Sequence, residues 1–254
     1  MVDLYKKPKL TYFLIGLCVL IFLYEIYFGL QHGNFGSEEF KNSLTDLFNE
    51  YGFSFQNLLD GKVWVFITSV FFHADPGHLI LNMIAWFIFG RVVEMDLGRK
   101  KFMLIFFVSA IVANLAFLTF SFLTNSFGTI VIGASAAIFG LMGTAMLVKP
   151  LEFVFYPYLI PVPLVLVAML YTLYNIASFF LVAVNLQESN ISYISHIGGL
   201  AAGMLFGFRE KGSRKGLIIL LILLAILVLT PLLGILLKYL EIFNYISVLS
   251  NFFK

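Results

Sequence analysis

Two polar side chains that could perform nucleophilic catalysis lie in two long apolar segments. Ser135 falls near the start of the uncharged segment Ile132–Val148, and His196 falls in the segment Ile191–Phe208. A serine hydroxyl is a weak nucleophile at neutral pH and needs an adjacent base. A neutral imidazole is suited to that task. The pair therefore indicates acyl-transfer chemistry carried out inside a bilayer.

Two further polar side chains could stabilise the oxyanion that such chemistry produces. His78 and Asn82 are four residues apart near the start of the apolar segment Gly77–Val93, so they share one helical face. Together with the backbone N–H of Ser135 at a helix start, they could supply the required hydrogen-bond donors. Because no acidic residue lies at this depth in the segments between 77 and 208, we predict a Ser–His dyad rather than a triad.

The composition places the chain in a membrane. It is 61% hydrophobic and 12% charged, with a mean hydropathy of +0.97, whereas soluble domains are about 45–50% apolar and about 25% charged. An excess of this size requires lipid as the solvent. The formal charge of +2 is too small to indicate nucleic acid as a partner. The single cysteine, Cys18, excludes an intramolecular disulfide and predicts a packing role.

Seven segments are long enough to span a bilayer, at about 20 residues each. We predict an all-α polytopic membrane protein, with a six-helix core in residues 1–215 and a seventh helix with a short external tail in residues 216–254. A cleaved secretory signal is the alternative for the first segment, but that segment is long for a signal core and lacks a small-residue cleavage site. The predicted spans are Leu10–Leu30, Gly77–Val93, Phe102–Leu123, Ile132–Val148, Val162–Val184, Ile191–Phe208 and Gly216–Leu237.

The distribution of lysine and arginine predicts the orientation. With the N-terminus in the cytoplasm, twelve of the sixteen basic residues fall in inside loops and four fall outside. Cytoplasmic loops carry such an excess. The C-terminus and the start of the segments that carry Asn82, Ser135 and His196 are therefore predicted to lie on the extracytoplasmic side. The four outside residues are Lys41, Lys62, Lys238 and Lys254.

The first loop, residues 31–76, is predicted to be external and structured. It has six acidic residues against two lysines, yet it is also rich in phenylalanine. This mixture favours an interfacial or partly embedded amphipathic structure. Glu25, near the outer end of the first span, is interpreted as a solvated or snorkelling acid.

Small residues recur at four-residue spacing in the two segments that carry the serine and the histidine. Gly199 and Gly203 follow His196, and Gly140 follows Ala136. Such stripes allow two membrane helices to approach closely. That approach is what a hydroxyl and an imidazole on different helices need to form a hydrogen bond.

With these residues identified, the chain resembles the rhomboid intramembrane serine proteases. The resemblance covers most of the core and rests on several motifs in a fixed order, which makes it specific. The motifs are the stretch Trp64–His73 at the end of the first loop, the set His73, His78 and Asn82, the set Gly90, Glu94 and Gly98, the tetrapeptide Gly133–Ala136 and the stretch Ser195–Gly203.

The resemblance implies a six-helix catalytic core, with the seventh helix as an addition found in some members. It implies Ser135 as nucleophile, His196 as general base, and His78 and Asn82 as ligands of the oxyanion, with no cofactor or metal. The implied reaction is peptide-bond cleavage in or near the transmembrane segments of single-span or multi-span membrane proteins. Substrates would enter beside the fifth span and the first loop, and the expected location is the cell membrane.

Three positions depart from the family pattern. Val65 stands where an arginine often follows the loop tryptophan, so the anchoring of the first loop is expected to differ. Ala136 replaces a frequent glycine. Phe139 stands where a tyrosine commonly stacks on the histidine, so stacking is expected without the hydroxyl. None of the three removes a reacting group.

Other functions remain as alternatives. A catalytically silent scaffold that binds client helices is one, although both Ser135 and His196 are retained. A transporter would need charged midplane residues and broken helices, which the sequence lacks. The spans contain neither an HExxH motif nor an aspartate pair. The sequence therefore does not indicate an intramembrane metalloprotease or aspartyl protease. A zinc site built from His73, Asp75, His78 and His196 is a further possibility.

Overall fold

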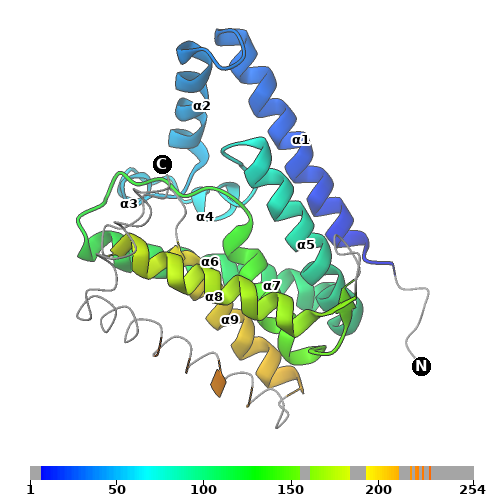
Figure 1. Ribbon diagram of the computed structural model, residues 1–254. Helices are drawn as coiled ribbons and strands as arrows, with labels where there is room; N and C mark the ends of the chain where they lie inside the picture. The colour runs from blue at the N-terminus through cyan, green and yellow to red at the C-terminus, as the bar shows by residue number, and fades with distance from the viewer. Residues whose placement is uncertain are drawn as a thin grey trace, which may run out of the picture.

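The computed structural model describes residues 7–154, 161–183 and 193–211, with isolated positions at 218, 221, 222, 225 and 229. Six helices among the described residues occupy the predicted spans, which confirms the polytopic all-α fold (Figure 1). The predicted seventh span and the boundary at 215/216 lie outside the described residues, apart from those isolated positions. The six helices in these spans are α1 (Lys9–His32), α5 (Pro76–Leu97), α6 (Arg99–Leu123), α7 (Ser135–Val148), α8 (Leu164–Ala183) and α9 (Tyr193–Lys211).

The remaining elements are short. The first loop forms three helices: α2 (Glu38–Tyr51), α3 (Phe55–Leu59) and α4 (Val65–Thr68). Between α7 and α8, β1 (Phe153–Val154) pairs antiparallel with β2 (Val162–Pro163), with Phe153 opposite Pro163. Both strands are only two residues long and lie near the proline cluster that was predicted to separate two spans.

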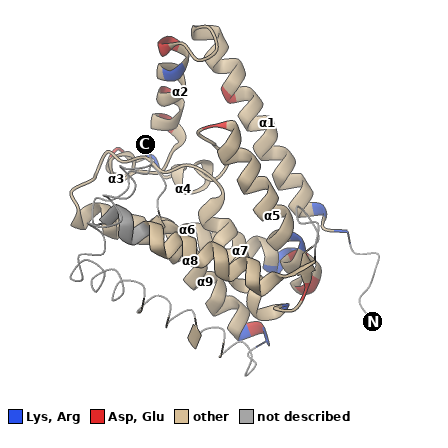
Figure 2. Ribbon diagram, viewed as in Figure 1, with Lys and Arg blue, Asp and Glu red and all other residues tan. Residues whose placement is uncertain are grey.

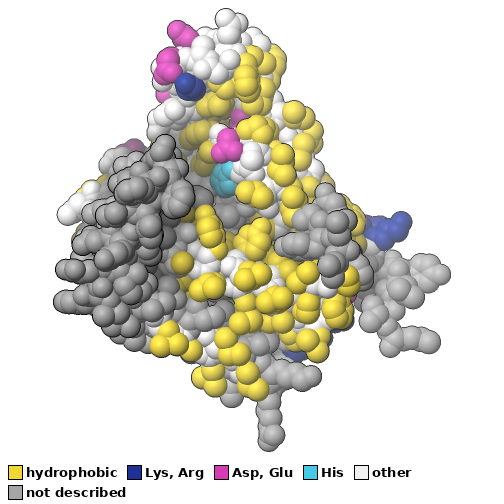
Figure 3. Space-filling model, in the orientation of Figure 1, with side chains coloured by type: hydrophobic (Ala, Val, Ile, Leu, Met, Phe, Trp, Pro, Cys, Tyr) yellow, Lys and Arg dark blue, Asp and Glu magenta, His cyan; other side chains and the backbone are white. Residues whose placement is uncertain are grey.

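The surface fits a lipid environment. Three helices of the described part, α1, α5 and α6, are long and apolar enough to cross a membrane. Hydrophobic side chains cover the middle of the visible face, and acidic side chains gather over α2 at one end (Figure 3). Basic side chains concentrate at the opposite end, where Lys101 pairs with Glu210 and Lys211 pairs with Asp96 at 2.7 Å (Figure 2). The chain is therefore a multi-pass membrane protein.

Helix α7 is the central element of the bundle. It packs against α5, α6, α8 and α9, and each residue from Ala136 to Val148 is buried (Figure 1). Its 14 residues rise about 21 Å at about 1.5 Å each, less than the roughly 30 Å of a hydrocarbon core. A helix this short begins below one surface of the bilayer when its other end reaches the opposite one. Its first residue, Ser135, is therefore placed at depth.

Helix α7 begins three residues later than predicted. We expected the span to start at Ile132, but residues 132–134 form an irregular turn that precedes the helix. Val131 forms an antiparallel bridge with Phe53, with N···O distances of 2.9 and 2.8 Å. Gly133 has φ of +112°, a left-handed conformation that favours glycine, and its N–H donates to the Ser69 carbonyl at 2.8 Å. Pairing with the first loop thus delays the helix and sets the turn that precedes Ser135.

Glycines allow α7 and α9 to touch backbone to backbone. A Cβ at Gly203 would lie 1.8 Å from the carbonyl oxygen of Gly140, and one at Gly199 would lie 2.0 Å from that of Ala136. The hydroxyl of Thr144 donates to the Gly203 carbonyl at 2.8 Å and so crosses the same interface. The predicted close approach of the two helices is confirmed.

Two buried glutamates attach α1 to the rest of the bundle. At one end, Glu94 of α5 accepts hydrogen bonds from Leu10 N, Thr11 N and Thr11 Oγ1 at 2.8–3.0 Å. Toward the other end, Glu25 accepts from the backbone N–H of His73 at 3.2 Å and is only 1% exposed. The interpretation of Glu25 as a solvated or snorkelling acid was therefore wrong, because its side chain faces the segment that leads into α5 rather than water.

The first loop is held by apolar packing. Helix α2 begins at its N-cap Ser37 and buries Phe40 and Leu47 on the side that faces α1. Val65 is fully buried in a cluster with Phe53 and Phe117. Where an arginine often stands, this chain therefore uses a small apolar side chain to pack the loop onto α6.

The α7–α9 contact predicts a position-specific sensitivity to an added methyl group. We expect Gly203→Ala to lower the stability by about 1–3 kcal/mol, because the new Cβ would collide with a backbone oxygen that cannot rotate away. Gly16→Ala is the matched control, since nothing lies within 4 Å of a Cβ there. Thermal unfolding in detergent measures both variants. Equal midpoints for Gly203→Ala and the wild type would contradict the contact.

Candidate active site

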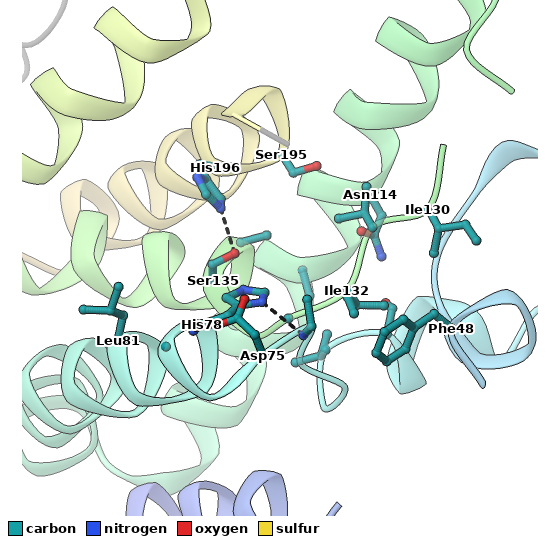
Figure 4. A pocket seen from close by; sticks show the side chains of 18 of the residues that line it. Phe48, Asp75, His78, Leu81, Asn114, Ile130, Ile132, Ser135, Ser195 and His196 are labelled. Carbon is teal, nitrogen blue, oxygen red and sulfur yellow. Dashed lines mark hydrogen bonds between the residues drawn. The ribbon is translucent and has the colours of Figure 1, made fainter. Parts of the chain in front are cut away.

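Ser135 and His196 form a hydrogen-bonded pair. Ser135 is the first residue of α7 and His196 lies in the first turn of α9, and their Oγ and Nε2 atoms are 2.7 Å apart. Figure 4 shows the two side chains facing one another from the two helices. His196 is 8% exposed, so the pair lies inside the protein. A hydroxyl at this distance from a ring nitrogen can pass its proton to the imidazole during an attack on a carbonyl.

The His196 ring has a second aromatic ring against its face. Phe139, one turn beyond Ser135 on α7, stacks on it with centroids 4.4 Å apart and planes at 6°. The stacking expected despite the missing hydroxyl is confirmed. Because a stacked neighbour restricts tilting of the ring, Phe139 keeps the imidazole in the plane that contains Ser135 Oγ.

The other ring nitrogen of His196 contacts a residue that the sequence did not single out. Nδ1 lies 2.5 Å from Oδ1 of Asn175 on α8, and Asn175 Nδ2 donates to the Tyr193 carbonyl at 3.0 Å. A dyad was predicted because no acidic residue lies at this depth, but an amide can occupy the same place. The signal was available, since a polar side chain in an apolar span usually faces the protein interior.

His78 and Asn82 both lie over the turn that precedes Ser135. Helix α5 begins with Asp75 as N-cap and Pro76 as first residue, and the Asp75 carboxylate accepts from His78 N at 2.9 Å. The His78 ring covers Gly133, where a Cβ would lie 2.7 Å from its Nε2. Asn82 Nδ2 donates one hydrogen to the His78 carbonyl at 2.9 Å, which leaves its second hydrogen available. The structure thus brings all four predicted site residues together.

Two cavities meet at Ser135. The larger, of about 620 Å³, is lined by the first loop, the turn before α7 and residues such as Asn114 of α6 (Figure 4). The smaller, of about 150 Å³, is mostly apolar and lies between α5, α7 and α8. Ser135, His78 and His196 line both. The hydroxyl therefore stands between a larger space whose mainly apolar lining includes polar side chains such as Asp75 and Asn114, and a smaller space that is almost entirely apolar.

His73 is a buried residue and not part of the reacting group. Its ring Nδ1 is 3.1 Å from the Phe71 carbonyl, and its ring meets that of His78 edge-on at 5.2 Å. Desolvation by burial lowers the pKa of His73 to about 4, so the ring is neutral. Among the residues the structure describes, no three His, Cys, Asp or Glu side chains lie close enough to hold a metal ion. The geometry gives the zinc alternative no support.

Comparison with known proteins agrees with the geometry. The family model described as Rhomboid domain matches residues 60–213. YdcA of Bacillus subtilis is 29% identical over 159 residues, which are 61% of this chain and 72% of that protein. Rhomboid protease GlpG of Haemophilus influenzae is 26% identical over 83% of this chain and 95% of its own length. Rhomboid protease AarA of Providencia stuartii is 30% identical over 59% of this chain and 57% of its own.

The family match covers well over half of the chain and contains all four site residues. All three of these relatives have the word protease in their names. The match also includes α5 to α9, the helices that surround Ser135. On this evidence the chain belongs to the rhomboid family.

Proposed function

We propose that the protein is an intramembrane serine endopeptidase that cleaves membrane proteins in or near their transmembrane segments. The observation that carries this proposal is the 2.7 Å contact between Ser135 Oγ and His196 Nε2 inside a membrane bundle. Membership of a family with relatives named proteases supports it. Ser135 acts as nucleophile and His196 as general base.

The reaction follows the general course of serine hydrolases. Ser135 Oγ attacks the carbonyl carbon of the scissile bond while its proton passes to His196 Nε2. The tetrahedral intermediate then collapses, the C–N bond breaks, and His196 returns the proton to the leaving amine. Water from the larger cavity attacks the acyl-enzyme, with His196 again taking and returning a proton, and regenerates the serine.

The oxyanion forms on the side of Ser135 where His78 and Asn82 lie. The Ala74 N–H points at His78 Nδ1 across 3.4 Å, so Nδ1 is the accepting nitrogen and the proton of the neutral ring is on Nε2. His78 Nε2–H, the second hydrogen of Asn82 Nδ2 and the free N–H of the first α7 turn are then three donors. Preorganised donors stabilise the charge that develops in the transition state.

Substrates are proposed to reach Ser135 from the lipid, between α5 and α8. The smaller cavity lies there, and its walls include Leu81 of α5 and Tyr174 of α8, each about 60% exposed on the outer surface. An apolar peptide segment could enter this space without first passing through water. Because a helical peptide bond is shielded by its own backbone, the segment must unwind locally before attack. Single-span and multi-span membrane proteins both satisfy this requirement.

A silent scaffold that binds client helices is the second candidate. It would use the same apolar space between α5 and α8 but no proton transfer at Ser135. The short Ser135–His196 contact favours catalysis, because a client-binding site has no need for a hydroxyl held against an imidazole.

The proposed location is the cell membrane, with the active site toward the extracytoplasmic side. In the described part of the bundle, Lys149 and Lys211 lie at the end of α7 and α9 opposite to Ser135 and His196. An excess of basic residues marks the cytoplasmic side. This orientation puts α2 and the larger cavity outside.

The dyad predicts that each member is essential. Ser135→Ala and His196→Ala should each reduce cleavage of a model single-span substrate in detergent to background, because no other group can supply the nucleophile or the base. Ser109→Ala is the control, since this buried serine has no hydrogen-bond partner among the described residues. Product bands on gels measure the rates. Cleavage retained by folded Ser135→Ala protein would favour the scaffold.

The oxyanion assignment predicts a loss in turnover rather than in binding. Asn82→Leu keeps the side-chain volume but removes the donor, and we expect kcat to fall by about 10²- to 10³-fold with KM nearly unchanged. His78→Ala should act in the same direction. Ile80→Ala, at a position 56% exposed to lipid on the same helix, should leave both constants unchanged. A pure KM effect of Asn82→Leu would place this side chain in substrate binding instead.

The proposed orientation can be tested with single cysteines in a Cys18→Ala background. Asn34→Cys, in the exposed turn between α1 and α2, should react with a membrane-impermeant maleimide on intact cells. Lys100→Cys, at the exposed start of α6, should react only after the membrane is opened. The opposite pattern would invert the topology.

A further inference from the structure

Asn175 is a buried amide with both of its polar atoms engaged. It lies on α8, is 3% exposed, and contacts α9 at two points: Oδ1 at 2.5 Å from His196 Nδ1, and Nδ2 at 3.0 Å from the Tyr193 carbonyl. A carbonyl oxygen only accepts hydrogen bonds. The Tyr193 carbonyl therefore requires the NH₂ group of Asn175 on its side and so turns the amide oxygen toward His196.

This orientation determines which nitrogen of His196 carries the proton. An amide oxygen only accepts, so His196 Nδ1 must be the donor in that contact. In the neutral imidazole the other nitrogen is then bare. That nitrogen is Nε2, the atom 2.7 Å from Ser135 Oγ. A bare Nε2 is what a base needs to accept the serine proton.

Resting on the proposed function, we infer that Asn175 is a positioning residue that completes a Ser135–His196–Asn175 triad by holding His196 in the Nδ1–H tautomer. Asn175 acts through the imidazole and not on the substrate. The same logic, with an amide as third member, is known from cysteine proteases of an unrelated fold. The sequence-based prediction of a dyad is thereby extended.

Asn175 and Phe139 constrain the ring in different ways. Phe139 lies against the face of the imidazole and restricts tilting, but a stacked ring can still turn within its own plane. The hydrogen bond from Nδ1 to Asn175 lies in the ring plane and opposes that rotation. Together, the two contacts fix the orientation of the ring so that Nε2 faces Ser135.

A neutral amide suits this environment better than a carboxylate. When His196 accepts the serine proton it becomes an imidazolium, and its Nδ1–H bond to Oδ1 becomes charge-assisted and stronger. An ionised aspartate at the same place would carry a desolvation cost throughout the resting state, inside a membrane bundle. The amide supplies an acceptor without a permanent buried charge.

Kinetics of two substitutions on α8 test this role. Asn175→Leu keeps the approximate volume but removes the acceptor, so we expect kcat to fall on the order of 10²-fold with KM unchanged. Thr172→Val is the control, because Thr172 is also buried on the same helix and, among the residues that the structure describes, its hydroxyl donates only to the Ala168 carbonyl. Asn175→Asp restores an oxygen acceptor and should recover most of the lost turnover. An Asn175→Leu enzyme with wild-type kcat would overturn the inference.

A measurement of the tautomer needs no variant at position 175 and no activity. The sample is Ser135→Ala protein labelled with ¹⁵N-histidine, in which protonated and unprotonated ring nitrogens give well-separated ¹⁵N chemical shifts. The His196 signals are assigned as those that disappear in the double variant Ser135→Ala/His196→Ala. We expect Nδ1 protonated and Nε2 bare at pH 8. A His196 protonated on Nε2 would refute the role of Asn175. If Nδ1 is protonated but the wild-type protein cleaves no substrate, the proposed protease function is refuted while the contact between Asn175 and His196 still stands.

Discussion

The contact between the α7 and α9 backbones is the constraint on which the site depends. Gly199 and Gly203 remove the side chains that would otherwise separate the helices, and they meet the carbonyls of Ala136 and Gly140. Only at this separation can a short side chain at Ser135 reach an imidazole on the neighbouring helix. A single methyl group inserted here would push apart the two elements that carry the reacting atoms. The small-residue stripe is therefore part of the geometry of the proposed active site as well as of the packing.

A second principle is that the site is assembled from neutral groups. The hydroxyl, two imidazoles and two amides are polar enough to handle a proton and an oxyanion, yet none needs a permanent charge in a low-dielectric interior. The buried acids are used elsewhere. Glu94 and Glu25 each accept backbone N–H groups and fix α1 against the bundle. The buried carboxyl groups of Glu94 and Glu25 thus hold the framework together, while the proposed reacting centre relies on hydrogen bonds between neutral groups.

The sequence predicted the helices and most of the site because both depend on simple rules. Hydropathy located the spans. The distribution of lysine and arginine gave their orientation, and the orientation placed Ser135 and His196 at the same depth as His78 and Asn82. Prediction from the sequence failed where tertiary contacts determine where a helix begins or which way a side chain faces. The late start of α7 depends on pairing between residues 53 and 131, and the burial of Glu25 depends on where His73 lies. Asn175 was not predicted because a lone amide in an apolar helix indicates only that its side chain faces the protein interior, whereas its role depends on its partner on α9.

The central claim is that Ser135 is a hydroxyl activated by its neighbour, and covalent modification tests it most directly. A fluorophosphonate reacts with activated serines and leaves ordinary ones unmodified. Mass-spectrometric mapping of the folded, detergent-solubilised protein after treatment should place one adduct on Ser135, and none on it when His196 is replaced. A folded protein that carries no adduct, or carries it on a different serine, would contradict the account.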